Sequence, residues 1–431
     1  MEHIVLDTAE SEKLKRFIPV SKQTIIMDLL NAPHWNEDER KLFDIFCAIF
    51  SALYHFKFHE NLETLKYCYM PFNPDADVIL TQQHSETRKQ ELRSTFIQEL
   101  ENLLNNANYE KLSETDINSA LEEESPYGVS VSVDLEDYAD MILYYRGTAT
   151  KVDYQRDWKW LFLKKKELRV PIYQRLLVVL RFKQEEERVK ELLSKNEKLT
   201  EKKARKQVKN SRATLPASLT GDMIFLKLFK NIPRHDIEML FPNQHVRLKL
   251  FDKIKLAVTG GGGTIGSIFI TVTKVAAAAN PFALVGAFIG LIGVIFRQIM
   301  SIFQHRTKYM MVLSQSLYFH NLDNNQGVIS YLIDMAEDEE CKEAILAYYF
   351  LATRKNYTQE VLDRAIEKYV SDKYQVGIDF EVEDGLQKLH NEGLLTKHSD
   401  GTLQVLGLQK ACECLDKQWD GFFQPANREN R

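Results

Sequence analysis

A stretch without acidic residues dominates the second half of the chain and runs from Lys253 to Leu322, although Asp and Glu make up 61 of the 431 residues. Within it, residues 256–273 and 275–296 are uncharged runs of 18 and 22 residues. As helices these runs would be roughly 27 and 33 Å long, close to the bilayer hydrocarbon core of about 30 Å. The sequence therefore predicts an integral membrane protein held by a helical hairpin between about Ile254 and Phe303.

The residues around the two runs indicate how the hairpin would lie in a bilayer. Basic residues precede the first run and follow the second, namely Lys249, Lys253, Lys255, Arg297, Arg306 and Lys308. Because basic flanks stay on the inner side of a membrane, an even number of crossings is favoured and both flanking parts share one side. Glycines spaced four apart, Gly262 with Gly266 and Gly286 with Gly290, would allow close helix packing within the hairpin or between subunits.

Two other interpretations of this stretch are weaker. A hairpin buried in a water-soluble core rarely lacks acids and polar faces over such a length. Gly261, Gly263 and Gly266 have the spacing of a dinucleotide-binding loop. That fold needs an acidic residue about 20 positions later to bind the ribose, and the sequence near position 280 reads AAANPFAL instead.

Composition limits the classes of protein and partner. The net charge of −5 gives no general attraction to nucleic acid, so we expect no nucleic-acid partner. The five cysteines are odd in number and scattered, which indicates reduced thiols rather than a disulfide framework or a zinc site. The polar, acidic N-terminus resembles neither a signal peptide nor a mitochondrial transit peptide, so the hairpin itself is expected to carry the targeting.

Apolar spacing divides the chain into regions of different secondary structure. In residues 41–69 apolar positions recur every three or four, as in amphipathic helices, whereas residues 129–135, 138–147, 157–166, 173–182 and 221–229 are aromatic or β-branched runs typical of strands. Residues 183–212 are charged throughout and predict a solvated helix or a mobile insertion. Helices at 340–352, 358–373 and 381–392, a hairpin turning at 399–401 and a last helix at 409–422 have the order of a winged helix.

The predicted fold class is α+β, in five parts. These are a helical N-terminal region at 1–120, a mainly antiparallel α+β domain at 121–250 with the charged insertion 183–212, a two-helix transmembrane hairpin at 251–306, a connecting helix at 307–336 and a winged-helix-like domain at 337–423. The third helix of that last domain carries four acidic residues and one lysine within 381–392, so duplex phosphate would repel it. Proteins are the expected partners of this domain.

Two groups of polar residues are candidate sites. His55, His59 and Glu63 lie four positions apart on one helical face, with Asp75 and Asp77 in the turn beyond, and two histidines at this spacing can bind zinc. Their aromatic neighbours favour ordinary surface or core histidines, and we assign no metal. Arg234, Asp236 and Glu238 lie in a short turn between two prolines before the hairpin. They are either a polar site or, as we favour, caps and headgroup contacts on an amphipathic turn.

Several segments together resemble the family of transmembrane protein 143. They are FIPVSKQTIIMDLL at 17–30, YHFKFHENLETLKYCYMPFNPDAD at 54–77, YYRG at 144–147, FKNIPRHDIEMLFPNQHVRLKLFDKIKL at 229–256 and IDFEVEDGLQKLHNEGLL at 378–395. The resemblance implies a domain of unknown function with two transmembrane helices, found in bacteria and associated with mitochondria in animals. It implies no reaction. With no transit-like N-terminus, a bacterial inner membrane with both termini cytoplasmic is expected, or the mitochondrial inner membrane in a eukaryote.

Three hypotheses about function follow. The favoured one is a membrane-anchored scaffold or regulatory protein that is not expected to be an enzyme or to hold a cofactor. It would contact the lipid bilayer and bind proteins through its C-terminal domain. The second is an oligomeric pore or transport accessory, assembled as a homo-oligomer through the glycines. The third is a metal-dependent enzyme that uses His55, His59, Asp75 and Asp77.

Overall fold

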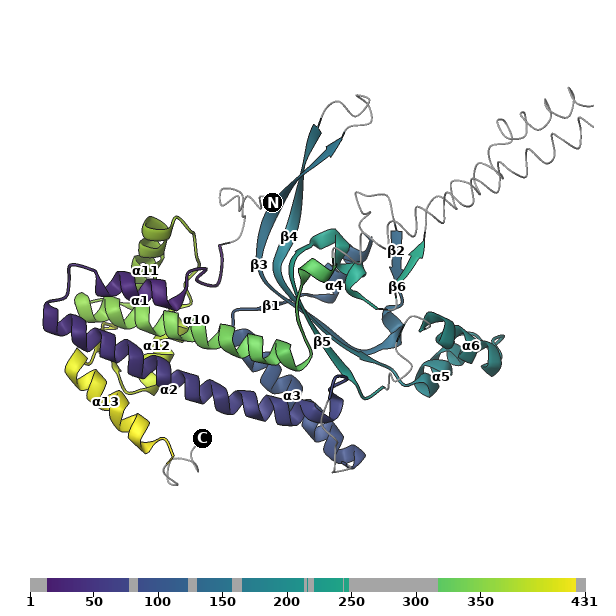
Figure 1. The fold of residues 1–431 in the computed structure, drawn as a ribbon, viewed down its shortest axis with the longest axis horizontal. Coiled ribbons are helices and arrows are strands. Elements are labelled where there is room, and N and C mark those ends of the chain that lie inside the picture. The colour runs from purple at the N-terminus through teal and green to yellow at the C-terminus, as the bar shows by residue number, and fades with distance from the viewer. Residues whose placement is uncertain are drawn as a thin grey trace, which may run out of the picture.

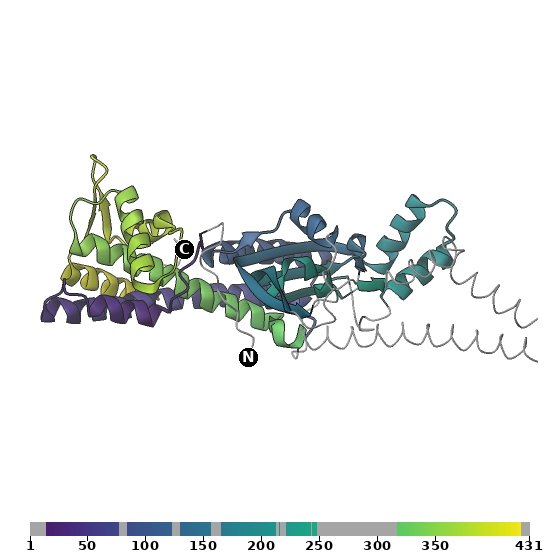
Figure 2. The ribbon, with the colours of Figure 1, turned by 90° about the horizontal axis from the view of Figure 1, so that it is seen from above.

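The structure is a computed structural model of the 431-residue chain, and it describes residues 14–76, 84–122, 130–156, 165–212, 215, 221–242, 244–247 and 317–423. The fold is mixed α+β, and the described residues include a five-stranded antiparallel sheet. Figures 1 and 2 show a helical body, the sheet and a pair of helices, α5 (Glu185–Lys195) and α6 (Glu201–Ser211), following one another along the long axis of the molecule.

The N-terminal part is helical, as its apolar spacing predicted. Its elements are α1 (Lys22–Leu30), α2 (Glu37–Tyr69), η1 (Met70–Phe72), α3 (Glu86–Asn106) and α4 (Glu114–Glu122). The long helix α2 begins at a capping box, in which Asn36 and Glu39 each accept a hydrogen bond from the other's backbone N–H. Phe43, Phe46 and Phe50, three and four positions apart, are fully buried along one face of α2.

The sheet has the strand order β1-β3-β4-β5-β7. Its strands are β1 (Glu110–Lys111), β3 (Tyr138–Arg156), β4 (Lys165–Phe182), β5 (Ile224–Pro233) and β7 (Asn321–Asn324), while β2 (Ser130–Val133) pairs separately with β6 (Gln244–Arg247). Strand β4 begins at Lys165, so the last two residues of the run expected at 157–166 belong to the same strand as the run at 173–182. The rest of the first run lies outside the described residues. Pro171 is tolerated in β4 because this part of β4 pairs only with β3.

The C-terminal elements follow the predicted order of helices and hairpin. They are α10 (Gln326–Thr353), α11 (Gln359–Tyr374), α12 (Val382–Asn391), β8 (Leu395–Lys397), β9 (Leu403–Val405) and α13 (Leu408–Gly421). Residues 307–336 were expected to form a connecting helix, but β7 and the start of α10 lie within that range. The short polar strand β7 has no strand-like sequence pattern and is formed by pairing with the edge of β5.

One hydrophobic core joins the two ends of the chain. Helix α10 packs between α1, α2, α3 and α12, and Phe46 of α2 stacks on Tyr348 of α10 with ring centroids 4.0 Å apart. Residues of α13, such as Leu415, belong to the same core. Among the described residues, α1, α2 and α3 of the expected region 1–120 and the helices of 337–423 therefore share one core and build one helical body, whereas Ile117 of α4 belongs to a second core.

The sheet has a different core on each face, because side chains alternate along a strand. Leu177 and Val179 of β4 point into the core of the helical body, whereas Leu176, Val178 and Leu180 point into a second core. The 3₁₀ helix η4 (Arg234–Leu240) covers part of that second face with Ile237, and Phe241 follows it. The apolar side expected for the short turn between prolines is therefore buried against the sheet.

The predicted membrane hairpin, with its four glycines, lies outside the described residues. In the part of the chain that is described, no helix combines the length and the apolar composition needed to cross a bilayer.

Candidate functional site

The charged insertion 183–212 folds into an antiparallel pair of helices, α5 and α6, which follows directly after β4. Val189, Ala204 and Val208 form a small core of their own between the two helices. The remaining faces are polar, as the charge pattern predicted. The insertion is therefore an ordered helical hairpin with one apolar seam, and its polar side chains are available for binding.

A buried ion pair fixes the end of α6 to the sheet. Asp137 lies in η2 (Leu135–Asp137), and its side chain is 1% exposed. Arg212 donates to it through Nε, 3.1 Å from each carboxylate oxygen, and through a second nitrogen 2.5 Å from Oδ1. Arg212 also donates to the Lys183 carbonyl at 3.0 Å. These bonds hold the hairpin in one orientation beside the end of β2.

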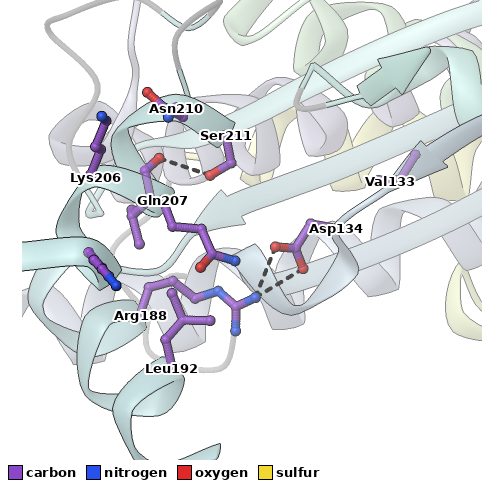
Figure 3. A pocket seen from close by; sticks show the side chains of 10 residues that line it. Val133, Asp134, Arg188, Leu192, Lys206, Gln207, Asn210 and Ser211 are labelled. Carbon is purple, nitrogen blue, oxygen red and sulfur yellow. Dashed lines mark hydrogen bonds and ion pairs between the residues drawn. The ribbon is translucent and has the colours of Figure 1, made fainter. Parts of the chain in front are cut away.

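A pocket of about 640 Å³ lies between α5, α6 and the end of β2, within the usual size range of small-molecule sites. Figure 3 shows Arg188 reaching from α5 toward Asp134, with Lys206 and Gln207 coming from α6. Val133 of β2 and Leu192 of α5 supply apolar wall, and Asn210 and Ser211 complete the α6 side. A cavity with an apolar wall and a few convergent polar groups is the usual form of a ligand site.

The floor of this pocket is the ion pair between Arg188 and Asp134, which belongs to a larger network whose charges balance. The Arg188 side chain is 4% exposed and donates to both Asp134 oxygens, at 2.9 and 3.1 Å. It also donates to Glu136 at 3.0 Å and Glu191 at 3.1 Å. Burial opposes the charge, yet hydrogen bonds to these acids keep the pKa of Arg188 above its ordinary value. Two further cations join the network, Lys183 on Glu191 and Lys195 on Glu136, each at 2.6 Å.

The rim of the pocket carries charge that no neighbour balances. Among the described residues, the exposed lysines of α6 at positions 202, 203, 206 and 209 form no ion pair. Lys203 and Lys206 line the pocket, and Lys202 and Lys209 do not. The sequence signal for this site was the change from acids early in the insertion to bases late in it. Asp134, the acidic residue of the pocket, lies about 50 residues before the insertion in sequence, and no local pattern predicts that it pairs with Arg188.

A second cavity, of about 360 Å³, lies over β4, β5 and β7. Its wall is mostly apolar, with Leu180, Phe225 and Phe229. The polar groups there satisfy each other, because Lys227 donates to the Asn324 side chain at 2.7 Å. Burial lowers the pKa of Lys227 against the opposing influence of Asp75.

The histidines considered as metal ligands do not converge with the acids. His55 pairs with Glu337 of α10 at 2.9 Å, and Glu63 pairs with Lys66 at 3.2 Å. His59 is exposed, Asp75 accepts a hydrogen bond from Asn325, and Asp77 lies outside the described residues. Within the described residues, no three His, Cys, Asp or Glu side chains are grouped to hold a metal ion.

The three polar residues of the turn before the predicted hairpin also diverge. Arg234 is exposed, and its guanidinium lies 5.2 Å from the centroid of the Tyr173 ring. Asp236 and Glu238 are only 9% and 2% exposed. The structure therefore does not bring these three side chains to one surface, because the 3₁₀ helix that carries them packs on the sheet.

The largest group of buried charges lies on α10 and serves the fold. Glu339, fully buried, accepts from the Ile18 N–H at 2.6 Å and from Arg146 at 2.7 Å. Lys342 lies 2.9 Å from the same carboxylate and donates to the Ile18 carbonyl at 2.7 Å. This cluster, the α10 clamp, ties the N-terminal segment to α10 and to β3. The charged groups of this cluster bind one another and the backbone, so we assign it a structural role rather than ligand binding.

One acidic residue of α11 is expected to make stability depend on pH. Burial, followed by repulsion from Glu367 and Asp379, raises the pKa of Asp363 from 3.8 to about 6. A raised carboxyl pKa means that its stabilisation is full below pH 3.8 and is lost as the pH rises through about 6. Asp363→Asn should remove this dependence and raise the free energy of unfolding at pH 7 by roughly 1 kcal/mol, after allowance for solvent screening.

The measurement is the denaturant midpoint of the parent and the Asp363→Asn variant across this pH range. Asp372→Asn changes an exposed carboxylate of the same helix and is the matched control. An Asp363→Asn variant with the pH profile of the parent would show that Asp363 does not titrate in the expected range.

One family model matches part of the chain. Residues 138–327 match the model of a family described as "Protein of unknown function (DUF3754)". The match begins with β3 and ends at the start of α10, so it includes the main strands of the sheet and the α5–α6 hairpin. No solved structure matches the chain.

Proposed function

We propose that the chain is a membrane-anchored scaffold or regulatory protein, with its helical body and sheet on one side of the membrane and protein partners bound to the helical body. The observation that carries the anchoring is the acid-free segment together with its points of attachment. The segment follows β6, which pairs with β2, and precedes β7, which pairs with β5. The strands before and after the acid-free segment thus belong to one folded unit. A hairpin that enters and leaves the membrane on the same side requires this.

The sequence resemblance to the transmembrane protein 143 family is part of this proposal, because the two membrane helices that it implies coincide with the acid-free segment. We place the protein in a bacterial inner membrane with both termini cytoplasmic, or in the mitochondrial inner membrane of a eukaryote. An oligomeric pore through Gly262, Gly266, Gly286 and Gly290 is the alternative that uses the same segment.

The C-terminal elements support protein partners rather than nucleic acid. Helices α10, α11 and α12, the hairpin β8–β9 and α13 follow the order of a winged helix, in which the third helix reads DNA. Here that helix is α12, with Glu383 and Asp384 in its first turn. Its single lysine, Lys388, is buried and pairs with Glu343 at 2.6 Å. No free positive charge remains on α12 for duplex phosphate.

An aromatic surface on the helical body offers a site for a protein partner. Phe56 of α2 lies beside Trp419 of α13 and Phe423, with ring centroids 5.0 and 6.0 Å apart. Trp419 is 36% exposed and Phe423 is 60% exposed. Aromatic side chains are enriched among the residues that contribute most to protein binding. This surface is therefore where we expect a partner to bind.

The test begins with membranes washed in alkaline carbonate. The chain should stay in the pellet, because its two uncharged runs, about 40 residues together, exceed what an interfacial helix buries. Cysteines introduced as Ser11→Cys and Asn427→Cys should label from the same side of sealed vesicles, and Ala278→Cys only from the other. Release by carbonate, or labelling of the termini from opposite sides, would contradict the anchoring.

Membranes that have not been washed with carbonate are crosslinked in a separate experiment, and the crosslinked proteins are identified by mass spectrometry. A partner of the aromatic surface should be lost from the double variant Trp419→Ala, Phe423→Ala and kept by Met27→Ala, which removes an exposed apolar side chain on α1. A crosslink that survives equally in both variants would place the partner elsewhere on the protein.

A further inference from the structure

We infer that the pocket between α5, α6 and β2 binds the phosphate headgroup of an anionic phospholipid. This inference rests on the proposed membrane anchoring and names a lipid partner for the same chain. The ligand is the glycerol phosphodiester of a lipid such as phosphatidylglycerol, with its phosphate at the lysines of α6.

The charge distribution selects an anion. In the pocket lining, Asp134 is matched by Arg188. Behind them Glu136 and Glu191 are matched by Lys183 and Lys195, so these six groups carry no net charge. Lys203 and Lys206 then add two positive charges at the rim without an acidic partner. A cation that entered the pocket would meet only repulsion at the rim, whereas an anion would meet two ammonium groups.

The polar groups beside these lysines suit a phosphodiester. Gln207 and Asn210 are exposed on the same side of α6, and their amides can donate to phosphate oxygens. Ser211 donates its hydroxyl hydrogen to the Val208 carbonyl at 2.8 Å, so its oxygen is left to accept from a glycerol hydroxyl. The apolar wall made by Val133 and Leu192 can accept the start of a lipid chain.

The position of the pocket in the fold favours a lipid over other phosphates. Val133 lines the pocket and pairs with Gln244 on β6, the last described strand before the acid-free segment. From Arg247, where β6 ends, to Ile254, where membrane entry is proposed, the chain has seven residues and can extend at most about 25 Å. The pocket thus borders the strand pair that leads into the acid-free segment.

The test measures binding of a short-chain, water-soluble phosphatidylglycerol to the full-length protein in neutral detergent by thermophoresis. A lysine near an anionic lipid surface contributes about a fivefold change in affinity. The double variant Lys203→Gln, Lys206→Gln should therefore bind roughly 30-fold more weakly than the parent. The matched control Lys202→Gln, Lys209→Gln removes the same charge from the same helix outside the pocket, and it should retain most of the affinity.

The other outcomes each overturn the inference. Equal weakening in both double variants would indicate diffuse charge attraction rather than a pocket. Inorganic phosphate that binds as tightly as phosphatidylglycerol would make this a site for free phosphate, and an RNA or DNA oligonucleotide that binds with the same dependence on Lys203 and Lys206 would make it a nucleic-acid site. Membrane anchoring is measured separately by carbonate extraction. A protein that stays in the membrane but does not bind phosphatidylglycerol would therefore refute the lipid site and leave the anchoring intact.

Discussion

Glu339→Gln is expected to lower the free energy of unfolding by about 3 to 5 kcal/mol, because it removes one partner from a buried ion cluster. Lys342, 4% exposed, keeps its ion pair with Asp338 at 3.2 Å. Arg146, 10% exposed, has no other ion-pair partner among the described residues and cannot recover one by turning to water. Glutamine keeps the shape and one acceptor oxygen, so the loss reports charge rather than a cavity. Chemical denaturation of the full-length protein at pH 7, followed by circular dichroism, measures it.

A second readout separates the α10 clamp from general destabilisation. Because Glu339 accepts from the Ile18 N–H, its loss should free the N-terminal segment, and trypsin should cut after Arg16 faster than in the parent. Asp334→Asn, an exposed carboxylate on the same helix, is the matched control and should stay within about 0.5 kcal/mol of the parent. A Glu339→Gln protein with the parent's denaturation midpoint and cleavage rate would show that the cluster does not hold this segment.

Asp137→Asn is expected to cost about 3 kcal/mol of the stability of the α5–α6 hairpin. The change leaves the Arg212 guanidinium, 14% exposed, beside a neutral amide, although Arg212 keeps its bond to the Lys183 carbonyl. Since Arg212 follows the end of α6, the hairpin should open locally before the sheet unfolds. Hydrogen exchange of the backbone amides measures this opening.

Exchange should rise in α5 and α6 and stay unchanged in β4, which is held between β3 and β5. Glu187→Gln, on the exposed face of α5, is the control that alters charge without breaking the pair. If hydrogen exchange in α5 and α6 is the same in the Asp137→Asn protein as in the parent, the small apolar seam alone holds the two helices in position.

Local sequence patterns predicted most of the helices and the β8–β9 hairpin. They did not predict features that depend on residues far away in the sequence. The spacing of Phe43, Phe46 and Phe50 predicted α2 because burial of one face is visible in sequence. Helix α10 was predicted to begin near residue 340 and begins at Gln326. In this helix Glu339 and Glu340 are buried beside cations from other elements. Spacing carries no information about such partners.

The candidate site was predictable only in part for the same reason. Acids early and bases late in residues 183–212 indicated a charged helical insertion. The pocket, however, needs Asp134 opposite Arg188, a pairing set by how the sheet and the hairpin pack. Spacing also made His55 and Arg234 candidates for polar sites, although ordinary surface roles were favoured for both, and in the structure their side chains have separate surroundings.

The core shared by α2, α10 and α13 determines the order in which the chain can fold during synthesis. Helix α2 ends at Tyr69, and α10, its first large partner after α3, does not begin until Gln326. At translation rates of about 5 to 20 residues per second, roughly 10 to 50 seconds pass between the synthesis of α2 and the synthesis of α10. Until then Phe46 and Phe50 have no complete core. The ribosome-bound chain therefore needs a chaperone or a neighbouring surface to cover α2 while the middle of the protein is being made.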